Sequence, residues 1–125
     1  MSPNLLFAVL LSVAMSAAAQ AFLKAGMSSP TVQQSFAGGR EVVALVAAVL
    51  GNAPVLLGLT LYGLSAVLWL FVLARLDLSK AYPFVGLGFI ATMVIGHAFF
   101  NEQVGAIRVL GTLLVACGVV MVARS

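Results

Sequence analysis

Apolar residues in this chain are gathered into long blocks. Four blocks each reach about twenty residues, the length that a helix needs to cross about 30 Å of hydrocarbon. They cover approximately residues 4–23, 54–74, 81–100 and 104–123. Very short connections join the last three, which places consecutive helices side by side and antiparallel. The pattern predicts an all-α membrane protein, a single transmembrane domain with four helices in an up-down-up-down bundle.

The stretch between the first and second blocks follows a different pattern. Residues 26–30 carry glycine, serines and proline, which are typical of a turn. Residues 31–39 are mainly small and polar, and residues 41–50 are apolar but too few to span a bilayer. We expect a short separate helix over about 41–50, at the membrane interface or dipping into it. The alternative is an extension of the second long helix, broken at residues 51–54.

Polar residues recur at every fourth position of the first block, at Ser12, Ser16, Gln20 and Lys24. Residues four apart lie above one another on one helix face, so these four form a polar stripe. Polar residues within a membrane helix usually face protein or a water-filled cavity. The serines could instead bond their own backbone or help helices to pack, and the lysine could reach the headgroups. The functional interpretation is a path for a polar substrate.

Composition supports the membrane assignment. The chain is 63% hydrophobic and 7% charged, with a mean hydropathy of +1.20. A soluble domain of 125 residues needs more polar surface than this. Its net charge of +3 comes from scattered cations without a basic run, which argues against a nucleic-acid partner.

The cations divide evenly between the two predicted sides of the membrane. Lys24, Arg40 and Arg108 lie opposite Arg75, Lys80 and Arg124. The positive-inside rule therefore leaves the orientation open.

A second polar cluster lies at the start of the third block. Its members are Arg75, Asp77, Ser79, Lys80, Tyr82 and Pro83. Tyrosine and cations are expected anchors at a membrane interface, and Arg75 and Asp77 are placed to form an ion pair. The functional alternative is a site for a lipid headgroup or phosphate at the mouth of the bundle.

The remaining polar residues contain no recognisable catalytic arrangement. His97 could relay protons or simply anchor a helix end, and Glu102 with Arg108 reads as an ion pair in a loop. We find no nucleophile–base pair, metal-ligand cluster or phosphate-binding glycine loop in the sequence. The prediction is a protein that is not an enzyme and that has neither cofactor nor metal.

Gly111 and Gly118 lie seven residues apart in the fourth block and so fall nearly on one helix face. Glycines there allow another helix to approach closely. The partner helix could belong to the same bundle. We favour a dimer contact, because four helices alone offer little room for a transport path.

The fourth block contains the run GTLLVACGVVMV, which resembles the small multidrug resistance proteins of the drug/metabolite transporter superfamily. In that family glycines at this spacing serve the dimer contact, which implies this role for Gly111 and Gly118. The chain departs from the family at Ser16, where those proteins have an essential membrane glutamate. The resemblance therefore does not imply proton-coupled export of cationic drugs.

The chain also resembles the EamA-like branch that includes the aminoarabinose-phosphoundecaprenol flippase subunits. The shared features are Ser16, Gln20 and Lys24 in the first block, and the run LWLFVLARLDLSKAYPFVGLGF with Trp69 and its Ala-Tyr-Pro step. This resemblance covers most of the chain except about residues 31–51.

The leading hypothesis is a transporter subunit in the bacterial inner membrane that moves a lipid-linked sugar or polyprenyl-phosphate lipid, as a homodimer or a heterodimer. The candidate substrate-binding residues are Ser12, Ser16, Gln20, Lys24, Arg75, Lys80 and Tyr82. One alternative is an exporter of small organic cations, with Tyr62, Trp69 and Tyr82 as aromatic contacts. The other is an accessory subunit of a membrane glycosyltransferase.

Overall fold

Helices make up most of residues 2–38 and 41–125, the part of the chain that the computed structural model describes. In chain order they are α1 (Pro3–Met27), α2 (Pro30–Ala37), α3 (Val42–Leu50), α4 (Ala53–Leu73), α5 (Leu78–Ala81), the 3₁₀ turn η1 (Tyr82–Val85), α6 (Gly86–Phe100) and α7 (Ala106–Arg124). Arg40, counted in the charge balance, and Gly39, in the linker, lie outside the described residues.

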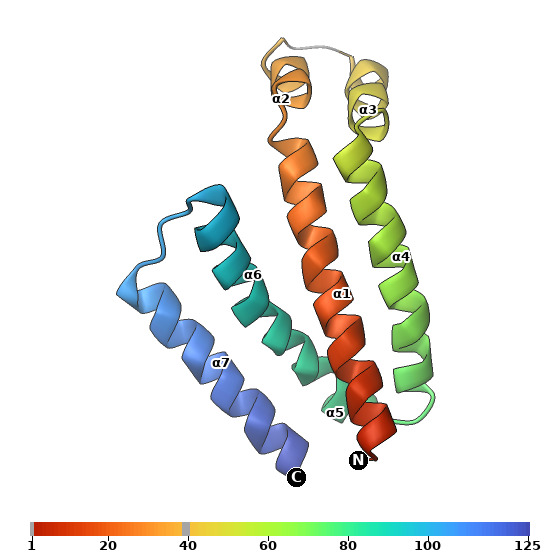
Figure 1. The fold of residues 1–125 in the computed structure, drawn as a ribbon, viewed down its shortest axis with the longest axis vertical. Helices are drawn as coiled ribbons and strands as arrows, with labels where there is room; N and C mark the ends of the chain where they lie inside the picture. Colours follow the sequence, from red (N-terminus) through yellow and green to blue (C-terminus); the bar gives the residue numbers. More distant parts are fainter. Residues whose placement is uncertain (1, 39–40) are drawn as a thin grey trace.

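Among residues 2–38 and 41–125, four helical segments are long and apolar enough to cross a membrane, as the sequence predicts. They are Pro3–Met27, Ala53–Leu73, Leu78–Phe100 and Ala106–Arg124. The chain ascends in α1, returns in α4, ascends again through α5, η1 and α6, and descends in α7, which confirms the up-down-up-down order (Figure 1). The third span begins with α5 and η1 before α6, and Pro83 lies in η1, because proline has no N–H to donate to a regular helix.

Local sequence signals determine where the first and second long helices begin. Ser2 caps α1, and its side chain accepts a hydrogen bond of 3.2 Å from the Leu5 N–H. Asn52 caps α4 in the same way, at 3.1 Å from the Val55 N–H. Each cap is followed by a proline in the first turn, where its fixed backbone angle suits a helix and its missing N–H costs nothing.

Helices α1 and α4 form the most closely packed pair, and glycines make this approach possible. A Cβ atom at Gly26 of α1 would lie 2.5 Å from Asn52 Oδ1 and 2.8 Å from the Val55 backbone nitrogen. A Cβ atom at Gly58 of α4 would lie 2.8 Å from the Leu23 side chain. The same Cβ atom would lie 3.0 Å from the Ala19 carbonyl oxygen. A side chain does not fit at either contact without a shift of its neighbours, so the glycines let the two helices approach closely.

The four long helices converge at the end that holds both chain termini. A small core there joins α1, α4, α5, η1 and α7, and consists of Val9, Val72, Ala81, Phe84 and Val119. Towards the other end α6 and α7 diverge from the α1–α4 pair (Figure 1). The cavity described below is lined by residues of α1, α4, η1 and α6.

Two short helices connect α1 to α4 and lie side by side beyond the ends of α6 and α7 (Figure 1). The predicted short helix is confirmed as α3, and Gly51 and Asn52 separate it from α4. That α3 lies at a membrane interface stays a prediction.

Helix α2 does not follow from the hydrophobic pattern of the sequence, because its residues are mainly polar and lack a long apolar face. The available signal was Ser29 followed by Pro30, a helix cap and a first-turn proline. The Ser29 hydroxyl also accepts a hydrogen bond from Asn52 Nδ2 at 3.1 Å, which ties the start of α2 to the start of α4.

Candidate functional site

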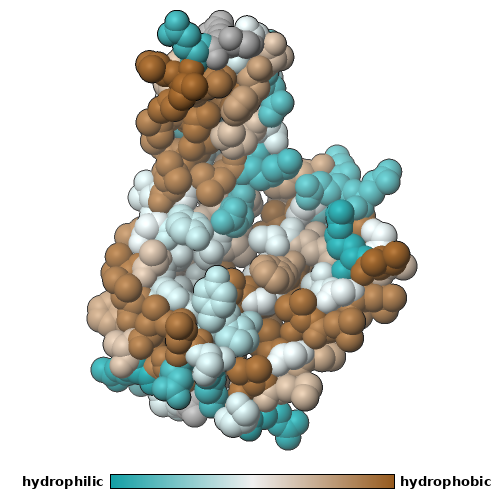
Figure 2. Space-filling view, turned by 180° about the vertical axis from the view of Figure 1, so that it is seen from behind, coloured by the Kyte–Doolittle hydropathy of each residue, from teal (hydrophilic) through white to brown (hydrophobic). Residues whose placement is uncertain are grey.

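A cavity of about 720 Å³ lies between α1 and α4 on one side and η1 and α6 on the other. The space-filling view shows it as a hollow with pale and hydrophilic side chains between hydrophobic walls (Figure 2). A concave site with a few placed polar groups is the usual form of a small-molecule site. Here it opens on the side of a bundle whose outer surface is apolar.

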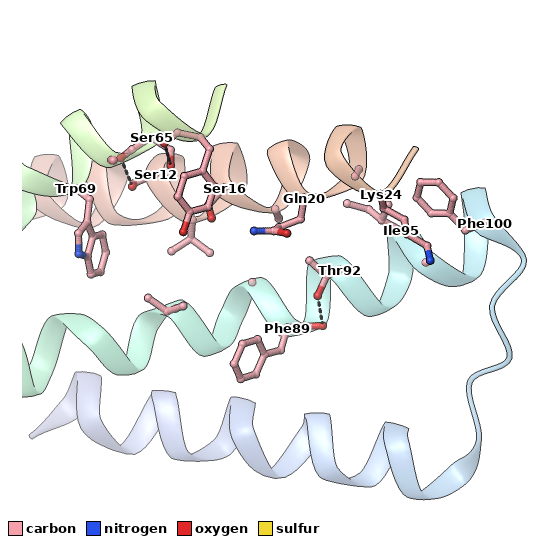
Figure 3. Close-up of a pocket in the computed structure, with 18 of the residues that line it drawn as sticks. Ser12, Ser16, Gln20, Lys24, Ser65, Trp69, Phe89, Thr92, Ile95 and Phe100 are labelled. Atoms are coloured by element: carbon pink, nitrogen blue, oxygen red, sulfur yellow. Dashed lines mark hydrogen bonds between the residues drawn. The ribbon is translucent and has the colours of Figure 1, made fainter. Parts of the chain in front are cut away.

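The polar stripe of α1 forms one wall of this cavity. Ser12, Ser16, Gln20 and Lys24 all line it and follow one another along the side of α1 that faces α6 (Figure 3). Twelve residues of helix separate the first from the last, a distance of about 18 Å. The stripe therefore covers more than half of the roughly 30 Å thickness of a bilayer core.

Exposure increases along the stripe. Ser12 is 3% exposed and Ser16 is half-buried, whereas Gln20 and Lys24 are both exposed. The cavity is therefore deepest near Ser12 and most open near Lys24.

Ser12 has a structural role at the deep end. Its hydroxyl donates to the Ser65 carbonyl oxygen at 3.0 Å and so joins α1 to α4 (Figure 3). The packing interpretation of the serines is correct for Ser12, although it also lines the cavity. No side-chain hydrogen bond of Ser16 or Gln20 occurs among the described residues, so their polar atoms remain available to a ligand.

The second predicted cluster divides in the structure. Tyr82 lines the cavity, but Arg75 and Lys80 do not. Both cations follow α4 and lie near the termini, at the end of the bundle opposite Lys24, and Lys80 Nζ donates to the Ser125 carbonyl oxygen at 3.2 Å. The structure therefore does not bring either of them together with Lys24 in one phosphate site.

Aromatic side chains form much of the remaining wall. Tyr62 and Trp69 come from α4, and Phe89 and Phe100 come from α6. Such side chains present flat apolar faces that contact sugar rings or attract cations. A polar stripe and aromatic faces in one cavity suit a ligand with both polar and apolar surfaces.

Glu102 is the site residue that the sequence analysis missed. The expected ion pair with Arg108 is wrong, because Arg108 Nη1 donates to the Gln103 carbonyl oxygen at 3.0 Å and Glu102 lines the cavity. The carboxylate lies against Gly96, where any Cβ atom would collide with Glu102 Oε1. The signal available in the sequence was Asn101, a residue that tolerates the left-handed conformation at a helix end and turns the chain back.

His97 anchors the turn that follows α6. Its Nδ1 lies 3.2 Å from the Glu102 carbonyl oxygen. This nitrogen must carry the proton, because a carbonyl oxygen only accepts. The anchoring role considered for His97 agrees with this contact. Within residues 2–38 and 41–125 no group of three or more histidine, cysteine or acidic side chains is arranged to hold a metal ion.

The face of α7 that carries Gly111 and Gly118 is open. A Cβ atom at either position would have no atom of a described residue within 4 Å, apart from its own helix backbone and its chain neighbours. Large apolar side chains on this helix, such as Leu114 and Met121, are also mostly exposed. The glycines therefore do not serve packing inside this bundle.

Sequence comparisons relate the chain to membrane transport proteins. Residues 35–115 match the family described as Small Multidrug Resistance protein, a region that excludes α1 and its polar stripe. A probable 4-amino-4-deoxy-L-arabinose-phosphoundecaprenol flippase subunit ArnE of Pseudomonas savastanoi pv. phaseolicola is 36% identical over 87 residues, which cover 70% of this chain and 76% of that protein.

Other relatives match over shorter regions. The corresponding probable ArnE of Pseudomonas syringae pv. syringae is 38% identical over 68 residues, 54% of this chain and 63% of that protein. A probable ArnF subunit of the same kind of flippase, from Photorhabdus laumondii subsp. laumondii, is 38% identical over 72 residues, 56% of this chain and 57% of that protein. The match thus spans less than two thirds of these two relatives, and no solved structure matches the chain.

Proposed function

This chain belongs to the small multidrug resistance family, and from that premise we propose that it is a transporter subunit for a lipid-linked sugar or polyprenyl-phosphate lipid. It is a multi-pass membrane protein, and we place it in the bacterial inner membrane. The observation that carries the proposal is the cavity lined by the polar stripe. The names of the relatives, flippase subunits for 4-amino-4-deoxy-L-arabinose-phosphoundecaprenol, support this substrate class.

The shape of the cavity suits a substrate with a polar head and a long apolar tail. A headgroup in the cavity would replace its hydration by contacts with the stripe, while its tail stays in the hydrocarbon outside the bundle. The hollow on the face of the bundle, lined by residues of α1, α4 and α6, gives the lateral opening that this arrangement needs (Figure 2). Leaving the tail in lipid avoids the large cost of bringing apolar surface into water.

Each stripe residue has a role in this proposal. Lys24 attracts the phosphate at the open end, since its ammonium is a compact cation with three donors. Gln20 and Ser16 bond the polar groups of the head along the path. Arg75 and Lys80, at the opposite end of the bundle, would receive the phosphate at the other membrane surface.

Native mass spectrometry tests the proposal directly. We expect the purified protein to retain undecaprenyl phosphate, or a glycosylated form of it, in preference to an excess of bulk phospholipid. A protein that retains these lipids no better than phosphatidylglycerol would contradict the proposed function.

The open glycine face of α7 supports a dimer, formed with a second copy or with a similar small subunit. Replacing both Gly111 and Gly118 with leucine should weaken dimerisation by about tenfold or more, equivalent to about 1.4 kcal/mol, because leucine keeps the partner helix away. Light scattering in detergent over a dilution series measures this.

Gly63→Leu on α4 is the control, since a Cβ atom at that position would also have no atom of the described residues within 4 Å. If the double variant dimerises as well as wild type, this face is not the dimer interface. A wild type that is monomeric in detergent would point to a heteromeric partner.

Export of small organic cations is the second candidate, favoured by the aromatic wall. Tyr62, Trp69 and Tyr82 all line the cavity, and aromatic faces attract organic cations. Saturable binding of tetraphenylphosphonium, together with no preference for polyprenyl phosphate, would favour this candidate over the lipid carrier.

A further inference from the structure

The loop after α6 holds Glu102 in a defined position at the open end of the cavity. Its backbone N–H donates to the Gly96 carbonyl oxygen at 3.1 Å, and its own carbonyl accepts from His97 Nδ1 at 3.2 Å. Asn101, in the left-handed conformation with φ 53°, reverses the chain between these contacts. A left-handed residue of this kind is a common way to end a helix. Three neighbouring residues thus fix the backbone that carries this carboxylate.

The side chain of Glu102 is directed back over α6. Gly96 is buried and has no side chain, and the carboxylate occupies the space that a Cβ atom there would need. Within residues 2–38 and 41–125 no side chain or backbone N–H donates a hydrogen bond to this carboxylate. Its oxygens therefore remain free to accept from a ligand.

Glu102 and Lys24 give the cavity opposite charges from two different elements. Of the described residues that line it, Glu102 is the acidic one and Lys24 the basic one; Glu102 lies in the α6–α7 loop and Lys24 on α1. A carboxylate that lines the same cavity as a phosphate-binding lysine repels phosphate and so works against a ligand that carries only negative charge. The arrangement favours a ligand that brings a positive group together with its phosphate.

We propose that Glu102 is a specificity-determining residue that accepts hydrogen bonds from the ammonium group of a lipid-linked amino sugar while Lys24 holds the phosphate. This assignment rests on the proposed function and narrows it to amino-bearing headgroups. Hydrogen bonds between an ammonium and a carboxylate are about twice as strong as neutral ones, so the charged amine is distinguished from an uncharged one. Phosphatidylethanolamine offers the same two charges, and the test must separate it from the amino sugar.

The test compares three lipids by native mass spectrometry: undecaprenyl phosphate, the same lipid carrying 4-amino-4-deoxy-L-arabinose, and that glycolipid with its amine acetylated. We expect wild type to retain the free amine about tenfold better than the acetylated form. In Glu102→Gln this preference should disappear, while undecaprenyl phosphate is retained at least as well as by wild type. Gly96→Ala, whose Cβ displaces the carboxylate, should also lose the preference, and Gly63→Ala should keep it.

Each outcome has a distinct meaning. If Glu102→Gln still prefers the free amine, the inference is overturned. An equal change in the retention of all three lipids overturns it too, because this would indicate that the carboxylate acts only through Lys24. Displacement of the amino-sugar lipid by phosphatidylethanolamine also overturns it. Failure of wild type to retain undecaprenyl phosphate or either glycolipid would instead contradict the proposed function itself. If Gly96→Ala does not fold, the Glu102→Gln comparison decides alone.

Discussion

Lys24→Ala is expected to reduce the retention of undecaprenyl phosphate by about tenfold or more, because it removes a charge-assisted contact with the phosphate. Among residues 2–38 and 41–125, Lys24 is the one basic side chain that lines the cavity, so no other described lining residue replaces its charge. Arg75 and Lys80 cannot do so, because they lie at the opposite end of the bundle. Native mass spectrometry over a range of lipid concentrations measures the loss, and headgroup translocation in vesicles should decrease in parallel.

Two variants test whether binding depends on a cation at position 24 or only on the net positive charge of the protein. Lys24→Arg keeps a cation in the same place and should retain most of the binding. Arg108→Ala removes a cation whose guanidinium bonds the Gln103 carbonyl outside the cavity lining, and it should bind like wild type. Equal losses in Lys24→Ala and Arg108→Ala would indicate a general electrostatic effect, and unchanged binding in Lys24→Ala would exclude the assigned role.

Gly26→Ala is expected to have the largest effect on stability and to destabilise the fold by about 1–3 kcal/mol, the usual range for forcing extra volume into a packed contact. The new Cβ would lie 2.8 Å from the Val55 backbone nitrogen, which cannot move without shifting the start of α4. It would also lie 2.5 Å from Asn52 Oδ1, the atom that caps that helix. Unfolding in detergent, followed by circular dichroism as denaturant is added, measures the change.

Gly63→Ala is the matched control for this prediction. It makes the same chemical change in the middle of α4, where a Cβ would have no atom within 4 Å. Since alanine favours a helix over glycine by about 0.5–1 kcal/mol, this variant should be as stable as wild type or slightly more so. If Gly26→Ala proved as stable as Gly63→Ala, this would contradict the close packing of α1 against the start of α4 at Gly26.

Parts of the linker and the roles of individual glycines could not be predicted from the sequence. The helix α3 could be predicted from its apolar run, and the turn before it from glycine, serine and proline. Helix α2 could not, because its residues are mainly polar and lack a long apolar face, and the burial of Val32 becomes visible only in the structure. Likewise the sequence contains twelve glycines without distinguishing Gly26, which permits a helix contact, from Gly63, which faces open space.

The four spans and the polar stripe were determined by the sequence alone, because hydrophobic length and a four-residue repeat are properties of one helix. Which residues of different helices meet was decided only by the tertiary structure. Chain reversal places Lys80 at the far end from Lys24, and the turn at Asn101 brings Glu102, which reads as a loop residue, into the cavity. These contacts depend on how far the helices diverge and on which loop folds back over the bundle. Neither property is encoded by a local pattern in the chain.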